Sequence, residues 1–123
     1  MPSPSLITLL NGLHRFKEDA PEMPISILIT LLSVAAHTPD GRVRQDPLSI
    51  LELSKLARQP YTTTSRHLRY LGDFERPGVP GLDYVETHIL PTDRRQKSVR
   101  LTPKGQRVIA QFKKLAEIEV ERS

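Results

Sequence analysis

The stretch Asp93-Arg94-Arg95-Gln96-Lys97-Ser98-Val99-Arg100-Leu101-Thr102-Pro103-Lys104-Gly105 decides more about the fold than any other part of the chain. Polar and apolar residues alternate from Ser98 to Leu101, as in a half-buried strand. Thr102 is a good helix N-cap, and Pro103 fits the first position of a helix. The charged residues before the strand then occupy the tip of a hairpin. The stretch therefore predicts a basic hairpin tip, its returning strand and the start of a helix.

Outside this stretch, most apolar residues recur at helical spacing. Helices are expected over residues 5–17, 24–36, 49–57, 60–74 and 103–121, and strands over 84–90 and 98–101. The second of these helices is apolar on nearly every face, which predicts that it is buried. A polar loop is expected over residues 37–47. The Pro and Gly content between Gly72 and Gly81 predicts a second loop. The pattern as a whole indicates a mainly α-helical fold with one small β-hairpin.

Length and composition point to one small domain, residues 1–123. Of the residues, 37% are hydrophobic, and the formal net charge is +4. This length is enough for one core but not for two ordinary ones, and the positive charge fits an anionic partner. The absence of cysteine excludes disulfides, thiolate metal sites and thiol-based redox sensing. The longest apolar run, residues 25–36, is too short for a bilayer, so we expect a cytoplasmic protein.

Residues 53–71 fit a helix-turn-helix. The face that packs the two helices together is expected to consist of Leu53, Leu56 or Ala57, Thr64, Leu68 and Leu71. On the first helix, Ile50, Leu53 and Leu56 are expected to face inward. The outer face of the second helix then carries hydroxyl-bearing and cationic side chains: Tyr61, Thr62, Thr63, Ser65, Arg66 and Arg69. Such side chains suit base edges and phosphates in a major groove. The alternative is an ordinary helical pair with a solvated basic face.

Three residues depart from the common form of this motif. Arg58 stands in the turn where Gly is usual, and Gln59 and Thr64 stand where Val-like residues are usual. The sequence Ser65-Arg66-His67-Leu68 nevertheless looks like the DNA-reading helix of many bacterial regulators. These departures leave the motif recognisable but make its turn unusual.

The hairpin tip is strongly basic, with Arg94, Arg95 and Lys97 close together. Like charges at one turn repel each other unless an anion neutralises them. A hairpin tip is narrow enough to enter a minor groove, where the concentrated negative potential favours inserted Arg side chains. The alternative is a solvated turn.

The stretches Gly81-Leu82, Tyr84-Val85-Glu86 and Asp93–Gly105 resemble the MarR family of winged helix-turn-helix transcription regulators. The resemblance is weak before Leu48 and strong from Leu53 to Gly105. It implies a winged helix-turn-helix fold with a DNA-binding lobe over about residues 48–102. It also implies that the arginine pair of the hairpin enters the minor groove. We favour Arg95 in that position, with Arg94 a close rival, and a structural role for Asp93.

The two ends of the chain each carry an apolar stripe that suits a dimer interface. The residues are Leu6, Leu9, Leu10, Leu13 and Phe16 near the start, and Val108, Ile109, Phe112, Leu115 and Ala116 near the end. MarR-like proteins dimerise through their chain ends, so residues 3–20 and 103–121 are the expected dimerisation elements. A two-fold dimer would place two reading helices about 34 Å apart and predict an inverted-repeat operator. Alternatively, both helices merely close the monomer core.

These features together predict a sequence-specific double-stranded DNA-binding transcriptional regulator, a homodimeric and nucleoid-associated repressor. Two other functions remain open: a winged-helix protein-interaction module, and a non-specific accessory DNA-binding protein. The four histidines show no metal-ligand spacing, and no pairing of acidic residues suggests acid–base catalysis. We therefore expect no metal, no cofactor and no enzymatic activity. The residues name no small-molecule effector.

Overall fold

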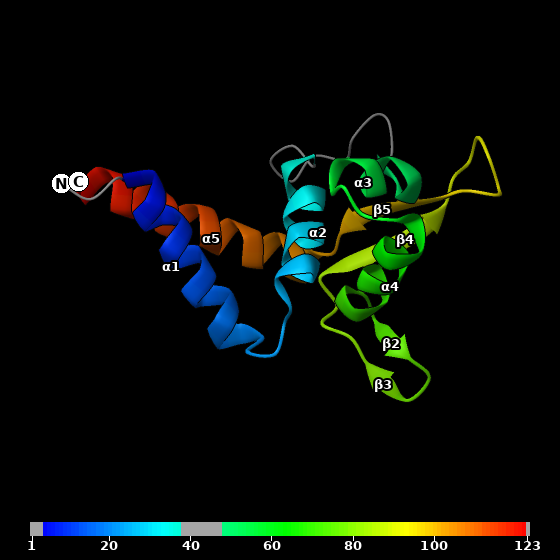
Figure 1. Cartoon of the computed structure of the whole chain (residues 1–123), viewed down its shortest axis with the longest axis horizontal. Coiled ribbons are helices and arrows are strands. Elements are labelled where there is room, and N and C mark those ends of the chain that lie inside the picture. The colour runs from blue at the N-terminus through cyan, green and yellow to red at the C-terminus, as the bar shows by residue number, and fades with distance from the viewer. Residues whose placement is uncertain (1–3, 38–47, 123) are drawn as a thin grey trace. The chain divides into compact units, whose positions relative to one another are not determined.

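The computed structural model describes residues 4–37 and 48–122 and contains five helices and five short strands there. Their bounds are α1 Pro4–Asp19, α2 Ile25–Ala36, β1 Leu48–Ser49, α3 Ile50–Leu56, α4 Tyr61–Leu71, β2 Phe74–Arg76, β3 Val79–Pro80, β4 Val85–Ile89, β5 Lys97–Leu101 and α5 Pro103–Arg122 (Figure 1). The polar loop expected over residues 37–47 lies almost entirely outside the described residues. The chain forms two compact units, residues 25–106 and the two chain ends, residues 1–24 with 107–123.

The unit of residues 25–106 is built around α2, α3, α4 and a small sheet. The side chains of Leu31, Val34, Leu53, Leu71 and Val85 are almost completely buried. The sheet is antiparallel with the order β1-β5-β4. Ser49 and Glu52 form a reciprocal capping box at the start of α3, which satisfies free N–H groups where strand β1 passes directly into a helix. One core therefore holds the helix-turn-helix against the hairpin.

The hairpin of β4 and β5 is the expected wing. Its strands pair in regular register from Val85 opposite Leu101 to Ile89 opposite Lys97. On β5, Val99 and Leu101 are buried while Lys97 and Arg100 are exposed, so the alternation in the sequence does place one face against the core. The predicted strand bounds are confirmed to within about one residue at most ends.

The helix-turn-helix packs through most of the expected residues, with one correction. Leu53, Ala57 and Thr64 are buried, whereas Leu56 is 44% exposed. Ile50, Leu53, Ser54 and Ala57 follow the i, i+3, i+4, i+7 spacing of one helix face, and Leu56 lies off that face. Of the two alternatives, Ala57 is therefore the contact residue, and the expectation that Leu56 faces inward was wrong.

The segment between Gly72 and Gly81 is a short hairpin, not the plain loop that we expected. Strands β2 and β3 pair Phe74 with Pro80 and Arg76 with Val79. Gly78, with φ of +79°, supplies the left-handed backbone that a tight turn after Pro77 requires. Helix α4 also ends earlier than expected, at Leu71, because Gly72 adopts an extended conformation. Pro and Gly thus mark a turn within paired strands here.

In the unit made of the chain ends, α1 contacts α5 at Gln111 and Phe112. The rings of Phe16 and Phe112 lie 5.7 Å apart, and Arg15 donates a hydrogen bond of 2.7 Å to Gln111. Of the apolar stripe on α1, Phe16 is buried, but Leu6 and Leu10 are more than half exposed. Within a single chain, therefore, this stripe is mostly uncovered.

Helix α2 is largely buried, as expected, although Ile25 and Ile29 are exposed at 71% and 44%.

Among the described residues, no helix combines the length and the apolar character needed to cross a bilayer.

The backbone conformation at Arg58 explains why Gly is usual at this position in the turn. Its φ is +55°, in the left-handed region, where an L-residue with a Cβ is disfavoured by about 1–2 kcal/mol. The turn adopts this conformation because Arg58 N–H bonds Lys55 O at 3.2 Å and Gln59 N–H bonds Ser54 O at 3.0 Å.

We therefore expect Arg58→Gly to raise the free energy of unfolding by about 0.5–1 kcal/mol, because relief of the strained φ outweighs the greater freedom of Gly in the unfolded chain. Urea denaturation measures this difference. Arg58→Ala is the matched control, since it removes the same side chain but keeps the Cβ. A glycine variant no more stable than the alanine variant would refute the explanation.

Candidate nucleic-acid interface

The outer face of α4 carries the polar side chains that the sequence places there. Tyr61, Thr62, Arg66 and Arg69 are exposed, and Thr63 and Ser65 are half-buried. On the opposite face, Thr64, Leu68 and Leu71 are buried. No side chain caps the start of α4, which follows Pro60, so N–H groups of the first turn remain free to bind an anion. This helix therefore presents hydroxyls and cations on one face and free N–H groups at its N-terminal end.

The tip of the wing is held by Asp93. One carboxylate oxygen of Asp93 accepts the Arg95 N–H at 3.0 Å, and the other accepts from the side-chain amide of Gln96 at 3.3 Å. The Gln96 N–H bonds Asp93 O at 3.0 Å, and Leu90 N–H bonds Gln96 O at 2.9 Å. The Asp93 carboxylate thus accepts hydrogen bonds from groups that form the turn and not from the guanidinium groups. Among the described residues, no carboxylate forms an ion pair with Arg94, Arg95 or Lys97.

A groove of about 490 Å³ lies between α4 and the wing. From α4 it is lined by Tyr61, Ser65 and Arg69, and from the wing by Arg95 and Lys97. A smaller hollow of about 220 Å³ is also lined by Tyr61, Arg95 and Lys97. The fold thus brings together five of the nine expected contact residues. The other four, Thr62, Thr63, Arg66 and Arg94, line neither hollow.

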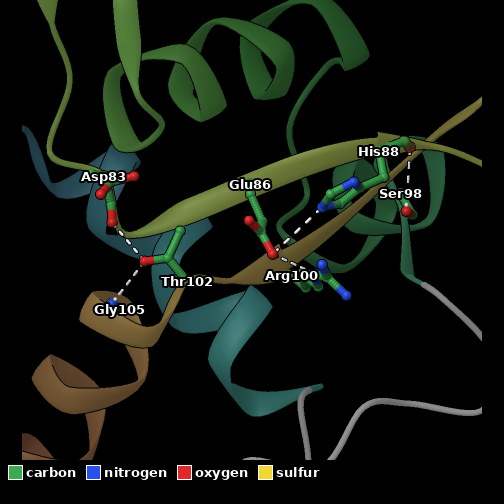
Figure 2. A network of polar contacts seen from close by, with 7 residues as sticks. All are labelled: Asp83, Glu86, His88, Ser98, Arg100, Thr102 and Gly105. Atoms are coloured by element: carbon green, nitrogen blue, oxygen red, sulfur yellow. Dashed lines mark hydrogen bonds and ion pairs between the residues drawn. The ribbon is translucent and has the colours of Figure 1, made fainter.

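The strands of the wing carry a paired set of charges, shown in Figure 2. Glu86 lies opposite Arg100 in the register and accepts a hydrogen bond from its guanidinium. His88 lies 3.4 Å from the same carboxylate oxygen. Burial alone would raise the pKa of Glu86, but hydrogen bonds from Arg100 and His88, and their charges, hold that pKa below its usual value. Arg100 is thereby neutralised, in contrast to the cations at the tip.

Thr102 joins the base of the wing to α5. Its hydroxyl donates to Asp83 O at 2.6 Å and accepts the Gly105 N–H at 3.0 Å (Figure 2). A Cβ on Gly105 would lie only 2.0 Å from Tyr84 O, so only Gly fits this close approach. The sequence predicts Thr102 as the cap of α5, but nothing in the local pattern shows the bond to Asp83.

The surroundings of His67, a residue of α4, do not follow from the sequence pattern. The spacing of the histidines predicts no metal site, and it does not show that Nδ1 of His67 lies 2.8 Å from the buried Thr30 hydroxyl. Burial, and then the charge of Arg66, lower the pKa of His67 below 6.5. In the sequence, only the polar Gln59 in the turn indicates a buried polar contact near α4, because the Val-like residue that is usual there needs no polar partner.

The lowered pKa makes His67 neutral at pH 7, and the unfolded chain then binds the proton more readily. The contribution of neutral His67 to the free energy of unfolding is therefore complete above about pH 6.5, the ordinary histidine pKa. It is lost as the pH falls toward the lower pKa that His67 has in the folded protein. We expect His67→Asn, which cannot titrate, to weaken the fall in unfolding free energy between about pH 7 and pH 5. Urea denaturation at a series of pH values tests this, and parallel curves for the two proteins would contradict it.

Similar folds are found among solved protein structures. The structure of RV1404 from Mycobacterium tuberculosis has a TM-score of 0.69 and 20% identity, over 96% of this chain and 69% of that one. The S. aureus MepR–DNA complex has a TM-score of 0.64 and 19% identity, over 89% and 76%. The transcriptional regulator PA4135 has a TM-score of 0.56 and 20% identity, over 99% and 82%.

No protein-family model matches the sequence, and neither does any curated protein. At these identities the likeness is one of fold, and it confirms the expected five helices and wing. The chain therefore has the fold of these structures, a winged helix-turn-helix.

Proposed function

We propose that this protein is a sequence-specific double-stranded DNA-binding transcriptional regulator that acts as a homodimer. The observation that carries the proposal is the groove in which side chains of α4 face unpaired cations of the wing. Arg69 from the helix and Arg95 and Lys97 from the wing line the same concave surface, which Asp73, Asp83 and Glu86 also line. A surface of this kind fits the phosphate backbone of a duplex between a major groove and a minor groove.

Helix α4 is the element proposed to read bases. An α-helix fits the major groove of B-DNA, where each base pair presents a distinct set of donors and acceptors. Arg66 and Arg69 can donate two hydrogen bonds to guanine, and the hydroxyls of Thr62, Thr63 and Ser65 can serve bases or phosphates. The uncapped first turn, which includes Tyr61, supplies N–H groups for a phosphate.

The tip of the wing is proposed to enter the adjacent minor groove. Arg94 and Arg95 are exposed and lack a described carboxylate partner, so DNA would neutralise their mutual repulsion. Arg95 also lines the groove that faces α4, and Arg94 does not. This supports Arg95 as the inserted residue. Asp93 would act indirectly, by fixing the backbone of the turn.

The structural neighbours support this proposal. MepR was solved bound to DNA, and PA4135 is named a transcriptional regulator. A regulator of this kind acts in the cytoplasm, on the nucleoid, and a repressor would occlude polymerase at its operator. The proposal assigns the chain no catalytic role.

The proposed dimer rests on the apolar stripe of α1. Leu6, Leu9 and Leu10 are 66%, 47% and 53% exposed in the single chain. Apolar side chains in such a row usually mark an interface, because exposing them to water is unfavourable. A second copy covering this stripe would give a two-fold dimer and hence an inverted-repeat operator.

Single-site variants test the two proposed DNA contacts. Arg66→Ala should weaken binding to a site selected from random duplexes by about 1–3 kcal/mol and affect random DNA little, because base contacts carry specificity. Arg95→Ala should weaken both and reduce the salt dependence. Fluorescence anisotropy across a salt series measures both effects.

Lys17→Ala is the matched control for these variants, since it removes an exposed cation from α1. It should leave both affinities nearly unchanged. Equal losses on every sequence for Arg66→Ala and Arg95→Ala would remove the case for α4 as the reader.

A charge placed in the α1 stripe tests the dimer. We expect the wild type to be dimeric at micromolar concentration by light scattering, and Leu10→Glu to be monomeric, because a carboxylate in an apolar interface is strongly unfavourable. Lys17→Glu introduces the same carboxylate at an exposed site outside the stripe and should remain dimeric. A monomeric wild type would rule the dimer out.

A further inference from the structure

A partly buried polar cluster connects α2 with the helix-turn-helix. Thr30, in the middle of α2, has a relative exposure of 0%. Its hydroxyl oxygen lies 2.9 Å from the side-chain oxygen of Gln59 and 2.8 Å from Nδ1 of His67. Gln59 also donates from its amide nitrogen to Ser26 O at 3.0 Å. One buried hydroxyl is thus placed between the turn and α4.

The chemistry of these groups fixes the direction of each hydrogen bond. The Gln59 amide must point its nitrogen at the Ser26 carbonyl, which can only accept. The Gln59 oxygen then needs a donor. The Thr30 hydroxyl gives its single hydrogen to this oxygen at 2.9 Å, and not to Ser26 O, which lies farther away at 3.2 Å and already accepts from Gln59. His67 must therefore donate from Nδ1 to the Thr30 oxygen. The result is a one-way relay, from His67 to Thr30, to Gln59 and to Ser26 O.

The relay holds both sides of the turn onto α2. Gln59 directly follows Arg58, the residue with positive φ, and its N–H closes the turn on Ser54 O. His67 lies in α4 directly after Arg66 and two residues before Arg69. The apolar contacts of α4, through Leu68 and Leu71, favour burial of that face but are non-directional. The hydrogen bonds from Gln59 and His67 add direction, since their energy falls steeply as geometry is lost.

We propose that Thr30, Gln59 and His67 are positioning residues that set the rotation of α4, so that its outer side chains meet base edges in register. This rests on the proposed DNA-binding function and deepens it. None of the three residues needs to contact DNA. Two-donor contacts to a base tolerate little displacement, so a small rotation of α4 reduces specific binding. Phosphate contacts have looser geometry, and non-specific binding is therefore spared.

The first test compares Thr30→Val with Thr30→Ser. Valine keeps the shape of threonine but can neither accept from His67 nor donate to Gln59, whereas serine keeps the hydroxyl. We expect Thr30→Val to weaken binding to a selected site about tenfold, the size of one base contact, and to leave random duplex within about twofold. Thr30→Ser should bind both as the wild type does. Affinities are measured by anisotropy at a temperature where thermal unfolding shows each protein folded.

His67 provides a second pair of variants if Thr30→Val does not fold. In His67→Asn the side-chain amide can take the place of Nδ1–H as the donor, whereas His67→Leu removes it. We expect His67→Asn to retain most of the specific affinity and His67→Leu to lose about tenfold, again without loss on random duplex. Nitrogen NMR of the wild-type imidazole should show the proton on Nδ1.

Three results would overturn the positioning role: specific affinity within about twofold of wild type for Thr30→Val or His67→Leu, equal losses on selected and random duplexes, or the His67 proton on Nε2. Failure of the proposed function would look different. A wild-type protein without any sequence preference would refute that function and remove the positioning role with it, before any variant is compared.

Discussion

Burial of one face of α4 is the constraint on which the rest of the structure depends. Thr64, Leu68 and Leu71 are each less than 5% exposed, and they lie on one side of a helix with 3.6 residues per turn. Their burial turns Thr62, Arg66 and Arg69 toward solvent. Thr64 fits this apolar site because its hydroxyl bonds the Pro60 carbonyl one turn earlier, at 3.1 Å. The core therefore determines which side chains are available to a partner.

The wing holds like charges close together, and the structure deals with their repulsion differently along the strands and at the tip. Along its strands, Arg100 is paired with Glu86. At its tip, Asp93 is used by the backbone of the turn, and the cations are left without a described carboxylate partner. Thr102 and Gly105 anchor the base of the hairpin against Tyr84 and Asp83. Paired strands with cations at the tip that have no described carboxylate partner suit a surface for a polyanion.

Much of this could be predicted from the sequence, and the exceptions have physical causes. The wing and the cap at Thr102 were predictable because strand alternation and capping are local properties. Leu56 was misplaced because two neighbouring residues, Leu56 and Ala57, fit the same spacing and only packing distinguishes them. The β2–β3 hairpin was missed because Pro77 and Gly78 signal a turn without showing whether strands flank it. The Thr30–Gln59–His67 relay joins residues 37 positions apart, which no local pattern reveals.

The most direct test of the account is fluorescence anisotropy of the wild-type protein with its own upstream DNA and with a shuffled duplex of equal length, over a range of salt concentrations. Sequence-specific reading by α4 predicts a preference of about a thousandfold or more for a duplex that contains the operator. Equal binding to both duplexes, with affinity collapsing as salt rises, would contradict sequence-specific reading by α4 at that DNA and indicate a non-specific DNA-binding protein. No binding even at low salt would contradict the whole interface and point to a protein partner.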